Sequence, residues 1–160
     1  MSYSFERSIV IHATPEQVYD NLLDVTSHKN WGEITEMELL YEGSAKVGSR
    51  WHSVGVMGKY VMRDECTIMA LERPNLFQFR SVSQDPLMGT VSMIWFYRLE
   101  KVPEGTRVTI SRGFVPEDMP GIMPLLLRVG VVRLMDNLMT AKIIDRGLAR
   151  LRDYVEQAHK

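Results

Sequence analysis

The sequence predicts an α+β domain in which a curved antiparallel sheet of seven strands wraps around one long C-terminal helix. Three observations lead to this class. A well-marked short helix follows a strand-like N-terminal segment, β-rich runs separated by turn signals fill residues 36–115, and a long apolar stripe with helical spacing ends the chain. The chain has 160 residues, and 45% of them are hydrophobic. We therefore expect residues 1–160 to form a single domain with its own core.

The first strand and the first helix are predicted by local signals. Residues 4–12 alternate as a strand does. Thr14 can cap a helix, and Gln17 three residues later completes a capping box, with Pro15 at the first helical position. One apolar stripe then follows, made of Val18, Leu22 and Val25.

A second short helical turn is expected directly afterwards. The first helix should end near residues 24–26, and Ser27 can cap a turn that runs to Trp31. The turn signals that follow predict six antiparallel strands: Gly43, Gly48, Gly58, Pro74, Pro86, Gly89 and the tetrad PEGT.

The C-terminal segment predicts one continuous helix of about eight turns that begins near Pro124. Its apolar stripe is spaced by threes and fours: Leu127, Val131, Leu134, Leu138, Ala141, Ile144, Leu148, Leu151, Val155 and Ala158. Because an antiparallel sheet usually buries one face, this helix is the expected cover. A single helix cannot fill a wide concavity, so the gap between helix and sheet is an expected pocket.

Composition excludes several classes of function. The net charge is −1, so no basic field for nucleic acid is present. No secretory signal and no uncharged apolar stretch of about 18 residues is visible, so we expect no transmembrane segment. Cys66 is the one cysteine and cannot form an intramolecular disulfide, which suits a cytoplasmic protein.

Several segments resemble a known superfamily. They are ATPEQVYDNLLDVTSHKNW (residues 13–31), VGSRW, LERPNLFQFR and WFYRLEKVPEGTRVTI. The sequence is similar to the START/Bet v 1-like (SRPBCC) superfamily, nearest the bacterial polyketide cyclase/dehydrase-like branch. The resemblance covers nearly the whole chain and implies the helix-grip fold with an apolar cavity between sheet and C-terminal helix. The superfamily includes lipid carriers, hormone receptors and aromatase/cyclases. The resemblance therefore implies a fold with a ligand cavity but does not identify the ligand.

No strong catalytic motif is present. The chain lacks GxSxG, CxxC, HExxH and a phosphate-binding glycine loop. Its histidines, at positions 12, 28, 52 and 159, have no metal-ligand spacing. We expect no metal and no cofactor, and we expect the Cys66 thiol to be buried and inert.

Strand alternation assigns candidate residues to the concave face of the last two strands. Arg112 is in phase with apolar residues that include Phe114, so it either binds a carboxylate, phosphate or phenolate of a ligand or extends to the rim. In the preceding strand, Met93, Trp95 and Tyr97 share one face. They either fill the core or wall a pocket in which the tyrosine hydroxyl orients a ligand oxygen.

The preceding strands offer two further candidates. Asp64 shares its face with Met62, and it is either an inward carboxylate that pairs with Arg112 or acts as general base, or a solvated edge residue. Trp51 and His52 must face opposite sides. We expect Trp51 to face the cavity, whereas the reverse register would make His52 the best general acid–base in the chain.

Residues 119–135 form an apolar segment whose two charges are both arginine. The segment is a pocket lid, a homodimer face, a transient membrane contact or a packed part of the core.

The preferred interpretation is binding of a small hydrophobic ligand (a lipid, polyketide or aromatic) between the sheet and the C-terminal helix. The first alternative is a polyketide aromatase/cyclase-type enzyme with Asp64, His52, Tyr97 and Arg112 as candidate catalytic residues, and the second is a protein-interaction module with a filled core. The expected ligand-binding residues are Trp31, Trp51, Met62, Met93, Trp95, Tyr97, Arg112, Phe114, Leu134 and Leu138.

Overall fold

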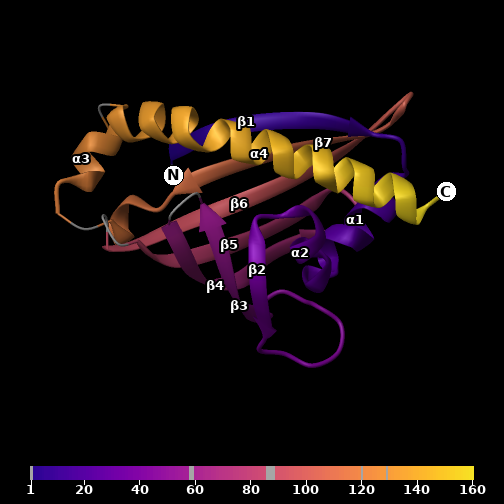
Figure 1. The fold of residues 1–160 in the computed structure, drawn as a ribbon, viewed down its shortest axis with the longest axis horizontal. Helices are drawn as coiled ribbons and strands as arrows, with labels where there is room; N and C mark the ends of the chain where they lie inside the picture. Colours follow the sequence, from indigo (N-terminus) through magenta and orange to yellow (C-terminus); the bar gives the residue numbers. More distant parts are fainter. Residues whose placement is uncertain (1, 58–59, 86–88, 120, 129) are drawn as a thin grey trace.

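The computed structural model describes residues 2–57, 60–85, 89–119, 121–128 and 130–160. Figure 1 shows the elements in chain order. They are β1 (Ser2–Ile11), α1 (Pro15–Leu23), η1 (Val25–Ser27), α2 (His28–Trp31), β2 (Ile34–Leu39), β3 (Arg50–Met57), β4 (Tyr60–Glu72), β5 (Leu76–Asp85), β6 (Gly89–Val102), β7 (Gly105–Phe114), η2 (Pro116–Asp118), α3 (Met123–Arg128) and α4 (Val131–Ala158). The predicted α+β class, with two short helices after the first strand, is confirmed.

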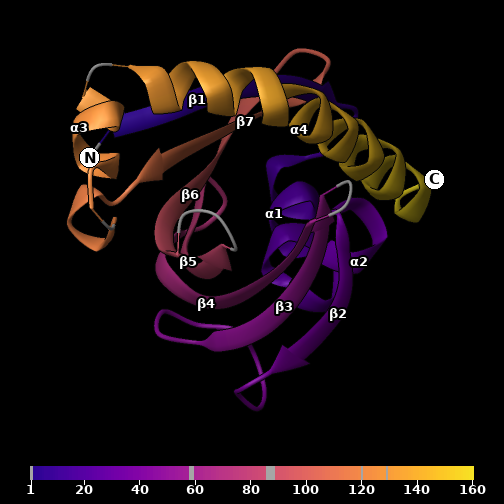
Figure 2. The same cartoon turned by 60° about the vertical axis from the view of Figure 1, so that its left-hand side comes forward.

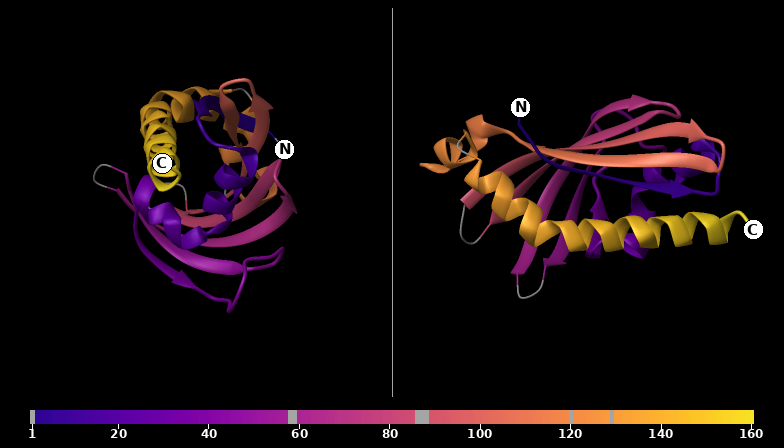
Figure 3. Two further views of the ribbon diagram at one scale, coloured as in Figure 1. Left: turned by 90° about the vertical axis from the view of Figure 1, so that its right-hand side faces the viewer. Right: turned by 90° about the horizontal axis from the view of Figure 1, so that it is seen from above.

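The seven strands form one antiparallel sheet in the order β1-β7-β6-β5-β4-β3-β2. Strands β2 to β7 pair as a meander, and β1 pairs with the last strand, β7. Figure 2 shows the sheet curving from β1 and β7 round to β2 and β3, with α4 lying across the open side. Figure 3 shows α4 running alongside the sheet for much of its length. The concave face therefore lies between the sheet and α4.

Helix α1 begins as its sequence predicts. The Thr14 Oγ1 atom accepts a hydrogen bond from the backbone N–H of Gln17 at 3.3 Å, and the Gln17 side-chain oxygen accepts one from the Thr14 N–H at 2.9 Å. Val18 and Leu22 are fully buried. These reciprocal bonds satisfy two backbone donors that a helix otherwise leaves unpaired.

Ser27 does not cap helix α2 with its side chain, so that part of the expectation is wrong. Its hydroxyl donates instead to the carbonyl of Asn21 at 2.7 Å and accepts from Trp31 Nε1 at 3.3 Å. Ser27 is buried, and a buried hydroxyl is stabilised by satisfying both its donor and its acceptor capacity. It thereby ties α2 to α1 and fixes the indole of Trp31.

The C-terminal helical segment is interrupted, whereas one continuous helix was expected. Helix α3 holds Pro124 in its first turn and ends at Arg128, and α4 begins at Val131. Between them Gly130 has a φ of 80°. This left-handed conformation is accessible to glycine at little cost and breaks the helical hydrogen-bond pattern.

The apolar stripe of α4 is buried only in its C-terminal half. Leu151 and Val155 are fully buried, but Leu134 and Leu138 are 63% and 73% exposed. A pattern of threes and fours has a period near 3.5 residues, so on a straight helix it drifts by about 20° for every seven residues. The N-terminal end of the stripe has therefore rotated away from the face that meets the sheet, where Thr140 is buried instead.

Two clusters of buried side chains form the core. The larger one joins α1, α2 and the C-terminal half of α4 to the strands, and it includes Trp31, Trp51 and Tyr97. The smaller one comprises Val91, Met93, Phe114 and Met119, with Leu126 of α3 packed against it. Residues of both clusters surround the site described next.

Candidate functional site

A cavity of about 260 Å³ lies between the concave face of the sheet, α2 and α4. Eight of the ten expected ligand-binding residues line it: Trp31, Trp51, Met62, Met93, Trp95, Tyr97, Arg112 and Phe114. Leu134 and Leu138 do not, because that part of the apolar stripe faces solvent. The helix contributes Thr140, Ile143, Ile144, Gly147 and Leu148 in their place.

Stacked aromatic rings form one wall of the cavity. The rings of Phe79 and Trp95 are nearly parallel, at 10°, with centroids 6.0 Å apart, and Phe79 and Tyr97 stack at 18° and 6.4 Å. Trp95 Nε1 donates to Ser81 Oγ at 2.9 Å, which fixes the indole plane. Such a wall offers an apolar aromatic surface that is already ordered.

Phe79 and Ser81 also line the cavity but were not predicted from the sequence, although the alternation of residues along β5 indicated them. Phe77, Phe79, Ser81 and Ser83 alternate along β5 and all point to the buried face. Because every second residue of a strand lies on the same face, this alternation alone would have placed Phe79 and Ser81 on the concave face.

Arg112 points into the protein instead of extending to the rim. It is 6% exposed and lines the cavity, with its guanidinium over the rings of Phe5, Trp95 and Phe114 at 4.8, 5.0 and 5.4 Å from their centroids. Phe5 and Trp95 lie directly opposite Arg112 on the two neighbouring strands. The strand register therefore builds this aromatic frame around a permanent positive charge.

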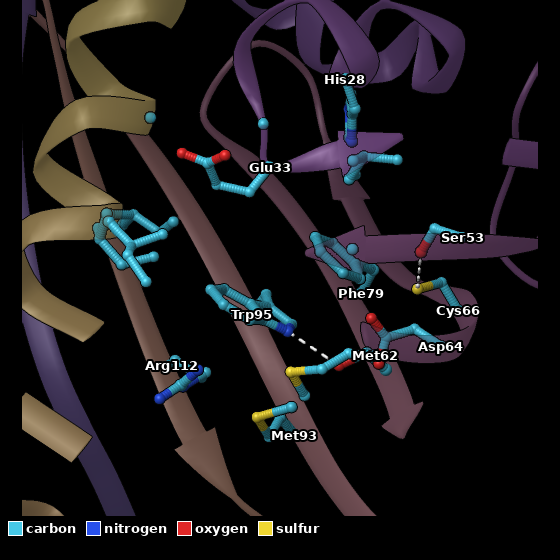
Figure 4. A pocket seen from close by; sticks show the side chains of 18 of the residues that line it. His28, Glu33, Ser53, Met62, Asp64, Cys66, Phe79, Met93, Trp95 and Arg112 are labelled. Carbon is cyan, nitrogen blue, oxygen red and sulfur yellow. Dashed lines mark hydrogen bonds between the residues drawn. The ribbon is translucent and has the colours of Figure 1, made fainter. Parts of the chain in front are cut away.

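Asp64 lines the cavity and is half-buried, so it is not a solvated edge residue. The Ser83 hydroxyl donates to its carboxylate. Burial raises the pKa of Asp64, while the Ser83 hydrogen bond and the charge of Arg112 act in the opposite direction. In Figure 4 Asp64 and Arg112 lie on either side of Trp95.

Tyr97 is buried, and burial raises the pKa of its hydroxyl, so the group stays protonated at neutral pH. A protonated phenol in an apolar cavity can donate a hydrogen bond to a ligand oxygen.

His52 lies on the opposite face of the sheet from Trp51, which is 1% exposed. The Nδ1 atom of His52 is 3.4 Å from Oε2 of Glu38, and its Nε2 atom is 3.7 Å from Oε2 of Glu65. Both glutamates lie on the outer surface. Strand pleating forces neighbouring residues to opposite sides, so His52 cannot act as an acid–base group inside the cavity.

His28 lines the cavity and was not predicted. It is 3% exposed, and its Nε2–H donates to the carbonyl of Leu22 at 2.8 Å. Burial lowers the pKa of His28 to about 4, so the ring is neutral at physiological pH. No sequence period marked it, because α2 is only one turn long.

The Cys66 thiol is buried near Ser53 Oγ, at 3.9 Å, and burial raises its pKa, which suppresses the reactive thiolate. Among the described residues, no cluster of three or more histidine, cysteine or carboxylate side chains could hold a metal ion. Within the same part of the chain, no helix is both long and apolar enough to cross a membrane.

This curved sheet closed by a C-terminal helix around a cavity defines a protein of the helix-grip, SRPBCC type, as the sequence resemblance implied. The family model described as "Polyketide cyclase / dehydrase and lipid transport" matches residues 2–156, and the chain belongs to that family. No protein with a curated description matches the chain.

Three similar solved structures share this fold. The Zhui aromatase/cyclase from Streptomyces sp. R1128 is 16% identical, with 98% of this chain and 94% of that one covered and a TM-score of 0.71. A conserved protein from Geobacillus kaustophilus is 14% identical, with 96% and 95% covered and a TM-score of 0.66. The allergen Ara h 8.0201 is 17% identical, with 94% and 95% covered and a TM-score of 0.62.

Proposed function

We propose that residues 1–160 form one domain that binds a small hydrophobic molecule in the cavity between the sheet and α4. The observation that carries this proposal is the cavity itself, which is lined mostly by aromatic, aliphatic and methionine side chains. Membership of a family described by cyclase, dehydrase and lipid-transport activities supports a hydrophobic ligand in general. Burial of apolar ligand surface supplies about 25 cal/mol per Å² before the costs of association.

Native mass spectrometry tests whether the protein carries a ligand when it is purified without denaturation. A co-purified lipid or aromatic compound of defined mass is the expected result. Gly147 offers a way to close the cavity, since it lines the space and a Cβ added there meets only the Trp31 carbonyl oxygen, at 3.8 Å. Gly147→Leu should fold and lose the ligand, whereas Gly147→Ala, the matched control, should keep it. Equal ligand content in both variants would contradict binding in this cavity.

An aromatase/cyclase-type activity is the alternative function. It is supported by Asp64, Tyr97 and Arg112, which surround one cavity in a fold shared with the Zhui aromatase/cyclase. The reaction would be intramolecular aldol closure of a poly-β-keto chain followed by loss of water, in which polar groups move protons and polarise carbonyls. Turnover of such a chain that disappears in Asp64→Asn and Arg112→Gln would favour the enzyme. Unchanged turnover in both variants would exclude those roles.

The protein-interaction alternative predicts a filled core, and the cavity argues against it. The protein nevertheless exposes an apolar surface, the α3–α4 patch, made of Ile122, Leu125, Val131, Leu134 and Leu138. Exposed apolar patches are typical of surfaces that contact proteins or membranes. We further propose that this patch makes transient contact with an anionic membrane surface, because residues 122–138, which span it, carry Arg128, Arg133 and one acid, Asp136, a net charge of +1. A homodimer through the same patch is the other outcome to test. A cytoplasmic location, where Cys66 stays reduced, belongs to this proposal.

A further inference from the structure

We infer that the cavity takes a compact aromatic monoanion, a carboxylate or a phenolate whose charged oxygen binds the guanidinium of Arg112. The inference rests on the proposed function, because it names the class of hydrophobic ligand that the same cavity would hold. Its basis is a buried permanent charge that faces the cavity from within an aromatic frame.

The described lining of the cavity has one positive charge, on Arg112. Arg112 is the sole arginine or lysine among the described lining residues, and a guanidinium stays protonated at any physiological pH. Of the two lining carboxylates, Glu33 is paired with Arg150, whereas Asp64 accepts from the neutral Ser83 hydroxyl and lies within the electrostatic influence of Arg112. In an apolar cavity a buried cation interacts strongly with an added anion, since water does not screen the pair.

Arg112 is also held in position before any ligand arrives. The rings of Phe5 and Trp95 lie directly across from it on β1 and β6, and Phe114 lies two residues further along β7. Packing against three rings orders the guanidinium, so little side-chain entropy is lost when an anion binds. A planar fork of this kind suits the oxygens of a carboxylate.

The neighbouring wall selects an aromatic body. Trp95 contacts Arg112 on one side and stacks with Phe79 on the other. A ligand ring packed against Trp95 and Phe79 would therefore place its acidic substituent beside the guanidinium. Figure 4 shows Arg112 and Trp95 projecting into the same space from neighbouring strands.

The volume of the cavity and the number of charges in its lining narrow the class of ligand further. The cavity of about 260 Å³ is just below the roughly 300–1,000 Å³ typical of small-molecule pockets, which favours one compact ring system over a long acyl chain. One cation, with Asp64 across the cavity, suits a single negative charge better than a phosphate dianion. A hydroxyl group at the far end of the ligand could donate to the Asp64 carboxylate.

Isothermal titration with cinnamate and cinnamamide tests the inference, because the two probes have the same ring and differ in charge. The wild type should bind cinnamate at least about tenfold more tightly, the difference expected of a charge-assisted hydrogen bond. Arg112→Met should bind both probes equally while retaining affinity for cinnamamide. Arg98→Met is the matched control on the exposed face of β6 and should keep the preference for the anion. Phenyl phosphate should bind the wild type more weakly than cinnamate does.

The outcomes separate this inference from the proposal beneath it. Equal affinity of the wild type for cinnamate and cinnamamide overturns anion recognition and leaves hydrophobic binding standing. A preference for cinnamate that persists in Arg112→Met assigns the anion to another group and also overturns it. Failure of both probes to bind the wild type overturns the inference, and an empty protein in native mass spectrometry then overturns the proposed function separately.

Discussion

His28 illustrates how burial sets the chemistry of a single side chain. In water a histidine titrates near pH 6.5, but here the ring is enclosed by Trp31, Trp51 and Phe77. Its hydrogen bond to the Leu22 carbonyl requires the proton on Nε2 and is made by the neutral ring. The ring therefore acts as an apolar core residue with one polar contact.

The lowered pKa of His28 predicts acid sensitivity. Below about pH 6.5 the unfolded chain binds a proton that the folded protein excludes until about pH 4. The stability due to the neutral ring is thus complete above about pH 6.5 and is lost as the pH falls toward 4. Between pH 7 and pH 4 the wild type should lose about 3 kcal/mol more free energy of unfolding than His28→Gln, which keeps the donor.

Urea unfolding at several pH values measures this difference. Because all other titrating groups are common to both proteins, their contributions cancel in the comparison. Parallel stability curves for wild type and His28→Gln would show that His28 titrates normally in the folded state.

At the scale of elements, the β6–β7 hairpin meets the connection between β1 and α1. Gly105 adopts a φ of 141°, and a Cβ added there would lie 2.2 Å from the Ile11 carbonyl oxygen. The next residue, Thr106, donates to the Ala13 carbonyl at 2.8 Å. The β6–β7 turn thus anchors the start of α1. This contact brings the two backbones so close together that only glycine fits at position 105.

Gly105→Ala should therefore destabilise the protein by at least about 2 kcal/mol, through backbone strain together with steric overlap. The matched control is Gly43→Ala, since Gly43 also has a positive φ, 74°, but nothing lies within 4 Å of the added Cβ. It should cost only about 1 kcal/mol. Thermal or urea unfolding of both variants measures the difference, and equal losses would contradict the close approach.

The apolar stripe of α4 is exposed in the N-terminal half of the helix and buried in its C-terminal half, and two substitutions can test this difference. Leu151→Ala removes a fully buried side chain and should cost about 2–5 kcal/mol. Leu138→Ala alters a side chain that is 73% exposed and should change stability by less than about 0.5 kcal/mol. A large loss at Leu138 would show that this part of the stripe is buried after all. Urea unfolding of the two variants decides the matter.

At the scale of the whole molecule, the cavity and the α3–α4 patch occupy neighbouring regions. Leu126 of α3 packs against the core cluster formed by Val91, Met93, Phe114 and Met119, three of which line the cavity. A surface that contacts α3 could therefore influence access to the ligand site. The proposed membrane contact would therefore bring the membrane surface close to the proposed ligand site.

A double substitution, Leu134→Gln with Leu138→Gln, tests the patch. Both side chains are exposed, so the fold should be unaffected. The wild type should co-sediment with vesicles that contain anionic phosphatidylglycerol and bind less to neutral phosphatidylcholine vesicles, and the variant should lose this binding. A wild-type dimer in light scattering that becomes monomeric in the variant would instead assign the patch to a second copy of the chain.

Most of the fold followed from local patterns along the chain. The capping box at Thr14 and Gln17, the turn signals between strands and the helical spacing of the last segment each act within a few residues. The strand faces were equally readable, because a period of two assigns every second residue to one side. For this reason Trp51, Trp95 and Arg112 were placed correctly on the concave face.

The failures occurred where distant parts of the chain decide the outcome. Leu134 and Leu138 share an apolar stripe with Leu148, but only the docking of α4 on the sheet selects which helical face is inside. His28 entered the cavity wall because α2 packs beneath α4, an arrangement that no local period encodes. Both errors concern the rotation and position of helices, which depend on long-range packing.

The sequence by itself determined the order of the elements, the inward faces of the strands and the class of fold, because caps, turns and alternation are short-range effects. Tertiary structure alone decided that a cavity of about 260 Å³ remains and that Arg112 stands within three aromatic rings. These features arise from how strand register and helix docking bring distant side chains together. The physical reason is that packing is a property of pairs of elements, whereas the sequence patterns describe each element alone.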